Sequence, residues 1–144
     1  MVGQTVLLAA LIFAPAAWRW AAPSRTLWAA PGLLLVAAGL AFAGKALLDL
    51  GPSLSPLPRP RRRAVLVQTG TYAYARHPIY GGLIVAGAGW TLWRTSGLHL
   101  LLAAALAVYL DAKARHEETL LMERFPDYAA YRARVTKRLI PWIF

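Results

Sequence analysis

The sequence predicts an all-α, polytopic membrane protein with about four transmembrane helices and a cytoplasmic C-terminal helical extension. Of its 144 residues, 58% are hydrophobic and only 15% are charged, which is more apolar than an ordinary soluble domain. The apolar runs lie at 6–20, 27–50, 79–93 and 98–110. The 27–50 run can cross a hydrocarbon core of about 30 Å as a helix, whereas the other three are short and must borrow flanking residues.

The first apolar run is predicted to be a retained helix and not a cleaved signal peptide. Its leading residues, MVGQT, include no Lys or Arg, and no convincing small-x-small cleavage site precedes a soluble domain. The chain has no cysteine, which excludes disulfides, thiolate catalysis and thiolate metal sites. We expect residues 1–144 to form a single domain.

The formal net charge of +10 is strongly segregated along the chain. Basic residues gather after the second and fourth apolar runs, while the alternate connections hold only Arg19, Arg25 and Arg94. By the positive-inside rule, both termini and the 51–78 loop are expected in the cytoplasm, with the bundle in the cell inner membrane. The charge thus indicates topology and contact with anionic lipid, and no nucleic-acid partner is expected.

The middle of the chain is predicted to be a cytoplasmic loop followed by a helical hairpin at 79–112. GPSLSPLPRPRRR opens the loop with four prolines, which deny the backbone a helix and favour extended geometry. The third apolar run is rich in Gly and Ala, which let neighbouring helices or a ligand approach its backbone.

The fourth apolar run is predicted to continue as one helix out of the membrane into the 113–144 region. The stretch LDAKARHEETLLMERF contains no Gly or Pro, and Pro126 is the first residue that would stop it. A last amphipathic stretch at 127–138 then places Tyr128, Tyr131 and Val135 on one face.

A cationic, anion-binding site is predicted where the third run begins, in the sequence GTYAYARHPIYGG. Pro78 suits the first turn of a helix, which puts His77 at or near the cap. A helix N-terminus beside Arg76 would suit a carboxylate or a phosphate. Each residue also has a structural explanation, since an arginine can reach lipid, a histidine can cap a helix and tyrosines can form an interfacial belt.

An anionic site is predicted in KARHEETLLMERF, at 113–125. At about 100° per residue, Glu117 shares a helix face with Lys113, so an ordinary ion pair explains it. Glu118 instead shares the apolar stripe with Phe125, where a carboxylate needs a cation or a ligand. Both sites face the cytosolic interface, and one zwitterion would satisfy the two of them.

Together the two blocks resemble the membrane methyltransferases of the isoprenylcysteine carboxyl methyltransferase and phospholipid methyltransferase group. The shared pattern is Gly-x-Tyr leading into Arg-His-Pro-x-Tyr-x-Gly, then a Glu-Glu pair, a Leu, a Phe and spaced tyrosines, over about residues 66–141. Two departures stand out. Thr71 occupies a position where a proline often follows the glycine, and the N-terminal half offers few helices to enclose an acceptor.

The resemblance implies a methyltransferase that uses S-adenosylmethionine at the cytoplasmic end of the bundle, on a lipophilic acceptor that arrives from the bilayer, and that needs no metal. The cofactor has a carboxylate for Arg76 and His77, and an ammonium for Glu117 or Glu118. The expected cofactor-binding residues are Arg76, His77, Tyr80, Gly81, Glu117, Glu118, Leu121, Phe125 and Tyr128. The expected catalytic residues are Glu118, which would take a proton from an amine acceptor, and Arg115, Arg124 or Arg138, which would orient an acidic one.

Several alternatives stay open at this level. The acceptor could be an isoprenylcysteine-like carboxylate, a phospholipid amine, another lipid or a small hydrophobic molecule. A sterol-type membrane reductase would need NADPH, for whose 2′-phosphate the arginines at 59–63 are available, although no glycine-rich dinucleotide turn is present. A non-catalytic protein that binds anionic lipid is a third interpretation. The short helices and the glycine-rich third run would also allow a homodimer.

Overall fold

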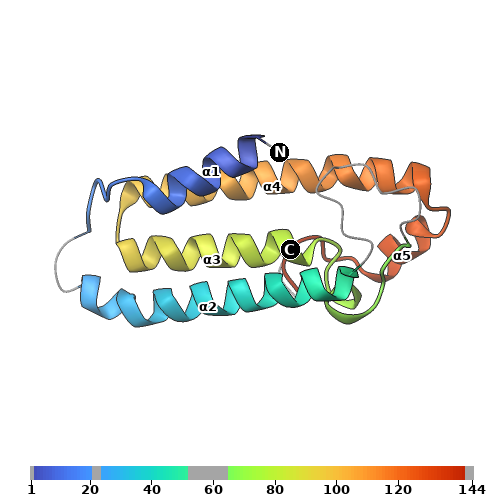
Figure 1. The fold of residues 1–144 in the computed structure, drawn as a ribbon, viewed down its shortest axis with the longest axis horizontal. Helices are drawn as coiled ribbons and strands as arrows, with labels where there is room; N and C mark the ends of the chain where they lie inside the picture. The colour runs from blue at the N-terminus through green and yellow to red at the C-terminus, as the bar shows by residue number, and fades with distance from the viewer. Residues whose placement is uncertain (1, 21–23, 52–64, 142–144) are drawn as a thin grey trace.

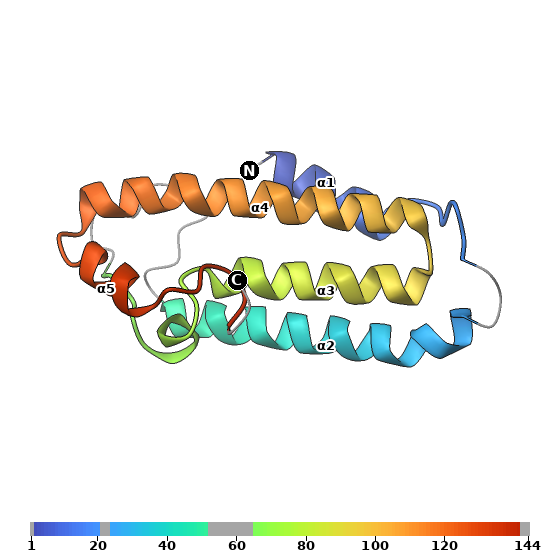
Figure 2. The same ribbon diagram turned by 180° about the vertical axis from the view of Figure 1, so that it is seen from behind.

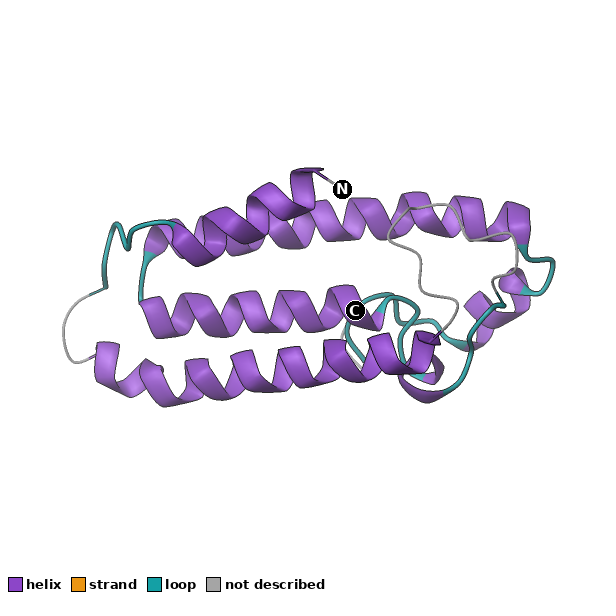
Figure 3. Cartoon of the chain, viewed as in Figure 1, coloured by secondary structure: helices purple, strands orange, loops and turns teal. Residues whose placement is uncertain are grey.

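The computed structural model describes residues 2–20, 24–51 and 65–141, and these residues are helical for most of their length. Most of the predicted Pro/Arg loop, at 52–64, lies outside the described residues. Within the described part, the predicted all-α class is confirmed (Figure 3). Its elements are α1 (Val2–Phe13), α2 (Ser24–Leu50), the 3₁₀ helix η2 (Gly70–Ala73), α3 (Pro78–Arg94), α4 (Gly97–Arg124) and α5 (Tyr128–Arg134).

The four longer helices run along one axis as two pairs. In Figures 1 and 2, α1 lies along the first part of α4, while α2 and α3 lie side by side for most of their length. The last turns of α4 extend beyond α3 toward one end of the bundle, where α5 and the connection before α3 gather. Tyr131 of α5 fixes this arrangement, because its hydroxyl donates a 2.7 Å hydrogen bond to the carbonyl of Tyr72 in η2.

Glycines let the backbones of α2 and α3 touch. A Cβ atom added to Gly39 of α2 would lie 2.5 Å from the amide nitrogen of Ala86 and from the carbonyl oxygen of Gly82, both in α3. Gly32 faces Gly89 in the same way, further along the pair. The prediction that small residues in the third run serve close helix packing is therefore confirmed.

Adding one methyl group at this contact is expected to be costly. Gly39→Ala should lower the free energy of unfolding by about 1–3 kcal/mol, because two backbones must separate to admit it. Gly44→Ala is the matched control on the same helix, since a Cβ there meets nothing within 4 Å. Thermal unfolding of both variants in one detergent measures the difference. Equal melting temperatures would contradict the packing described here.

The first helix is shorter than the sequence analysis predicted. α1 ends at Phe13 and does not run on to residue 20. Pro15 explains the stop, because proline lacks an N–H and disfavours helical backbone in the residue before it. The residues that follow instead bond to the turn between α3 and α4: Trp20 donates its N–H to the carbonyl of Thr95, and Gly97 donates its own to the carbonyl of Trp18.

Two helices of the described part are long and apolar enough to cross a membrane, namely α2 from Thr26 to Leu50 and α4. α1 has 12 residues and α3 has 17, so they measure roughly 18 and 25 Å. Large apolar side chains of α2, such as Leu34 and Leu48, are exposed, as contact with lipid requires. The expectation of about four spanning helices stays a prediction.

The C-terminal region follows the sequence prediction closely. α4 continues without a break to Arg124, as expected from the absence of Gly and Pro. The last amphipathic helix is shorter than predicted, since α5 ends at Arg134. Its predicted apolar face is confirmed, because Tyr128, Tyr131 and Val135 form one buried cluster.

Candidate functional site

The sequence that opens α3 forms a helix start of the predicted kind. Pro78 occupies the first turn and His77 is the N-cap residue, without a side-chain capping bond. Just upstream, Thr71 donates from its N–H and its hydroxyl to one carboxylate oxygen of Asp49, at 2.8 and 3.0 Å. A proline at position 71 could not make the backbone bond, so this departure from the family pattern ties η2 to α2.

The predicted cationic and anionic sites meet in a direct ion pair. Arg76 Nε lies 2.8 Å from Glu118 Oε1, and the two residues are only 7% and 3% exposed. The requirement for a cation beside Glu118, inferred from its place on an apolar stripe, is thus met inside the protein. The two charges neutralise each other here, whereas the resemblance implied that they would hold opposite ends of a ligand.

A C-terminal strap, residues 135–140, covers the start of α3. The carbonyls of Val135 and Thr136 accept from Arg76 Nη1 at 2.6 and 2.8 Å. The strap also accepts from the backbone N–H groups of Arg76 and His77, at 3.0 and 2.7 Å. The donors expected to bind an anion are therefore bonded to carbonyl oxygens of the strap.

Gly81 allows this close approach. A Cβ atom at position 81 would overlap the carbonyl oxygen of Leu139 in the strap. Gly81 was expected among the cofactor-binding residues that the family resemblance implies. In the structure, the atom nearest to a Cβ added at position 81 belongs to the protein's own backbone.

The second carboxylate of the pair has different neighbours. Tyr80 donates its hydroxyl to Glu117 Oε1 at 2.7 Å, while Lys113 Nζ lies 3.9 Å from the same oxygen. The predicted contact between Glu117 and Lys113 is present, but the shorter bond comes from α3. His77 stacks on Tyr80 and brings its Nδ1 to 3.6 Å from Glu117, so one imidazole lies between the two carboxylates.

Three buried polar atoms near Glu118 have no hydrogen-bond partner among the described residues. They are His77 Nε2, Arg138 Nε and the hydroxyl of Tyr128. The first two lie 3.5 Å from Glu118 Oε1, too far or too poorly aligned to form a hydrogen bond. Burial raises the pKa of the Tyr128 phenol well above its ordinary value, so it stays a neutral donor. The cluster thus retains unused capacity for a polar ligand.

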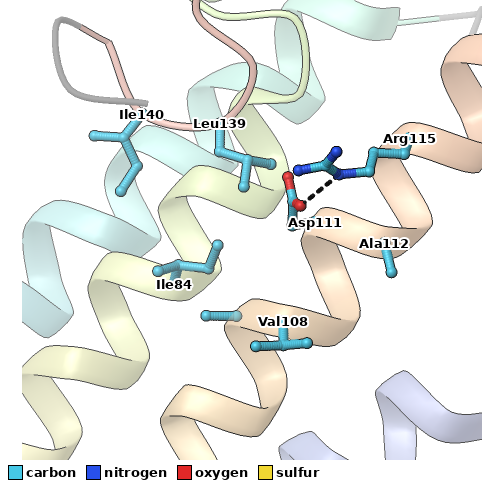
Figure 4. A pocket seen from close by; sticks show the side chains of 8 residues that line it. Ile84, Val108, Asp111, Ala112, Arg115, Leu139 and Ile140 are labelled. Atoms are coloured by element: carbon cyan, nitrogen blue, oxygen red, sulfur yellow. Dashed lines mark hydrogen bonds and ion pairs between the residues drawn. The ribbon is translucent and has the colours of Figure 1, made fainter.

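A groove of about 490 Å³ lies between α3, α4 and the strap (Figure 4). Arg138 links it to this charged cluster, because its guanidinium contacts both Asp111 and Glu118. The walls of the groove are mainly apolar and come from α3, α4 and the strap, with Ile84, Val108, Leu139 and Ile140 among the lining residues. Asp111 and Arg115 give it one charged end, where Arg115 Nε lies 2.7 Å from Asp111 Oδ2. The volume and lining are typical of a site for a small molecule with a large apolar part.

The remaining predicted residues fall into two groups. Leu121 and Phe125 pack against the buried cluster of Tyr128, Tyr131 and Val135, near Glu118. Arg115 borders the groove with a largely exposed side chain, and Arg124 is the exposed last residue of α4. The arginines at 59–63, on which the reductase and lipid-binding interpretations depend, lie outside the described residues.

Asp111 was not among the site residues predicted from the sequence, and Arg138 was named only as one of three arginines that would orient an acidic acceptor. Arg138 Nη1 donates to Asp111 Oδ1 at 2.8 Å, so the two residues join the groove to the charged cluster. A signal was available, since Asp111 lies seven residues before Glu118 and therefore on the same face of α4.

A sequence model of the phospholipid methyltransferase family matches residues 27–128 of this chain. The chain belongs to the phospholipid methyltransferase family. The match takes in the Arg-His-Pro block and the Glu-Glu pair and ends at Tyr128, so the family resemblance inferred from those motifs is confirmed.

Two curated proteins are similar to this chain in sequence. Methanethiol S-methyltransferase 1 of Bradyrhizobium diazoefficiens is 42% identical over 72 residues, which are 49% of this chain and 24% of that protein. The cobalt-zinc-cadmium resistance protein CzcN of Cupriavidus metallidurans is 30% identical over 143 residues, which are 95% of this chain and 59% of that protein. The chain thus spans less than two thirds of the length of either relative.

The fold is also that of a solved membrane enzyme. The eukaryotic intramembrane Ras methyltransferase, an isoprenylcysteine carboxyl methyltransferase, superposes with a TM-score of 0.74 at 22% identity. The superposition covers 99% of this chain and 50% of the other. This chain therefore shares the fold of that membrane enzyme, and the predicted all-α membrane fold class is confirmed.

Proposed function

We propose that this chain is an integral membrane methyltransferase that uses S-adenosylmethionine and a lipophilic acceptor. The observation that carries the proposal is the convergence of the two family motifs, through Arg76 and Glu118, at a site that Arg138 links to a mostly apolar groove. Family membership supports the reaction class, and the adjacency of a charged cluster and a groove supports a two-substrate site.

The residues around Glu118 fit S-adenosylmethionine. Glu117 and Glu118 offer carboxylates for an ammonium, and His77 Nε2 and the Tyr128 hydroxyl are buried polar atoms without a hydrogen-bond partner among the described residues. Leu121, Phe125 and Tyr80 offer partly buried apolar surface for an adenosine. When bound, this cofactor supplies an electrophilic methyl carbon on a sulfonium.

The strap restricts access of a ligand to Arg76. The guanidinium of Arg76 bonds to Glu118 and to two strap carbonyls, so a ligand carboxylate would reach that guanidinium only by displacing the strap. We therefore assign the first contacts with cofactor to His77, Glu117 and Glu118. Arg76 and Gly81 would hold the strap and Glu118 in place, and would touch the cofactor only after the strap moves.

We assign the acceptor to the groove between α3, α4 and the strap. Methyl transfer is an in-line displacement at carbon, so the protein has to align the two reactants and exclude water. Arg115 borders the groove and could orient an acidic acceptor, which makes it a better candidate than Arg124. Glu118 is already bonded to Arg76 and is assigned here to the cofactor ammonium, so an amine acceptor would have to lose its proton to another group and not to Glu118 as the resemblance implied.

Labelled cofactor tests this proposal. The purified protein in lipid should transfer the methyl label from S-adenosylmethionine to a component of a total lipid extract, and Glu118→Gln should reduce that transfer at least 10-fold. Glu123→Gln is the matched control, because Glu123 is an exposed acid on the same helix. Absence of labelled product with lipid and with small hydrophobic thiols would overturn the proposal.

The proposed location is the cell inner membrane, with both termini in the cytoplasm. The segregation of Lys and Arg supports this orientation, and the shared fold supports a membrane setting. Reporter fusions at residues 1 and 144 test it, since both should be active on the cytoplasmic side.

A homodimer, which the short helices would allow, is tested by the mass of the detergent-solubilised protein.

A further inference from the structure

Arg138 is the one side chain of the strap that bonds to the groove wall and also approaches Glu118, among the described contacts. Its backbone is held in place, because its carbonyl accepts from the N–H of His77 at 2.7 Å. The next two residues, Leu139 and Ile140, line the groove. The backbone of Arg138 is therefore held at the boundary between the groove and the charged cluster, and its guanidinium extends from there to α4.

Two carboxylates of α4 compete for this guanidinium. Nη1 donates to Asp111 Oδ1 at 2.8 Å, whereas Nε lies 3.5 Å from Glu118 Oε1 and has no hydrogen-bond partner within the described part of the chain. Asp111 is also held through its other oxygen by Arg115, at 2.7 Å. Arg138 therefore makes its shorter contact with Asp111, while its contact with Glu118 is a longer ion pair.

The alternative position of Arg138 would compete with a ligand for Glu118. Glu118 Oε1 already accepts from Arg76 at 2.8 Å, and Arg132 approaches Oε2 at 3.8 Å, so a second bonded guanidinium would add a further positive charge against the same carboxylate. A ligand ammonium would then meet the repulsion of that cation and the competition of a charge-assisted hydrogen bond, which is among the stronger polar contacts in proteins.

We propose that Asp111 is a positioning residue that restrains Arg138 and so keeps Glu118 available to the ammonium of S-adenosylmethionine. The inference rests on the proposed function, and it assigns to a groove residue an effect on cofactor affinity. Because Asp111 borders the groove, a bound acceptor that shifts it also changes the cation beside Glu118. Acceptor and cofactor are in this way linked through one guanidinium.

The test measures the affinity of the purified protein for S-adenosylmethionine by calorimetry, without an acceptor. Asp111→Ala should weaken binding about 5- to 50-fold, a size typical of coupled sites. The double variant Asp111→Ala, Arg138→Gln should restore the dissociation constant to within about threefold of the wild type, because the released guanidinium is gone. Glu123→Gln, an exposed acid on the same helix, should leave it unchanged.

Two results would overturn the inference. One is an unchanged affinity for S-adenosylmethionine in Asp111→Ala, and the other is a double variant that binds as weakly as the single one. All affinities are compared at a temperature at which thermal melting shows every variant to be folded, because the second substitution would also relieve the instability of an unpaired guanidinium. A wild-type protein that does not bind S-adenosylmethionine would remove the proposed function itself, which is a different result from wild-type binding that is insensitive to Asp111.

Discussion

Arg76→Ala is expected to destabilise the protein by about 3–5 kcal/mol, which is the usual cost of leaving one partner of a buried ion pair uncompensated. Glu118 is 3% exposed and would keep its charge without its closest cation. The strap would lose two further hydrogen bonds, from Arg76 Nη1 to Val135 and Thr136. Denaturant unfolding followed by tryptophan fluorescence measures the change.

Two further variants separate the ion pair from general damage. Removing both charges, as Arg76→Leu with Glu118→Leu, should destabilise less than Arg76→Ala, because no buried charge is left alone. Arg132→Gln is the control, since Arg132 also approaches Glu118, at 3.8 Å, but is 46% exposed. Its loss should change stability by less than about 1 kcal/mol. A result in which Arg132→Gln and Arg76→Ala are equally destabilising would contradict a buried pair.

Gly81→Ala is expected to detach the strap from α3. The added methyl group would overlap the carbonyl of Leu139, which is backbone and cannot rotate away. The backbone N–H groups of Arg76 and His77 would lose their strap acceptors, so their hydrogen exchange should accelerate at least 10-fold while that of mid-α4 amides stays unchanged. Mass spectrometry of hydrogen exchange on peptic fragments measures both regions.

Gly87→Ala is the matched control for this effect. It lies on the same helix, and the closest atom to an added Cβ there is a flexible side-chain methyl of Leu11 at 3.3 Å. It should leave the exchange of Arg76 and His77 unchanged. Accelerated exchange in both variants would mean that α3 as a whole had loosened, and equal protection in Gly81→Ala would mean that the strap does not depend on this glycine.

The sequence predicted the features that follow from periodicity and charge. Helical spacing put Glu118 on an apolar stripe, and the cost of a buried carboxylate then required the cation that Arg76 supplies. The same reasoning placed Tyr128, Tyr131 and Val135 on one buried face. These inferences succeeded because each depends on residue type and on the fixed 100° rotation per helical residue.

Other features could not be predicted in this way. The strap bonds to α3 through backbone carbonyls, which every residue carries, so no residue type marks its path. The early end of α1 was predictable from Pro15, but hydropathy alone extends the helix to residue 20. Gly81 is compatible with either a ligand or a backbone neighbour. Only the fold identifies that neighbour as the carbonyl of Leu139.

The affinity for S-adenosylmethionine tests the central claim most directly. Isothermal titration of the wild type should show binding, and Glu118→Gln should weaken it about 10- to 100-fold, as expected for the loss of a hydrogen bond to a charged group. Glu123→Gln should bind like the wild type. Absence of binding to the folded wild type, or equal affinity in Glu118→Gln, would contradict the proposal that the junction of Arg76 and Glu118 is a methyl-donor site.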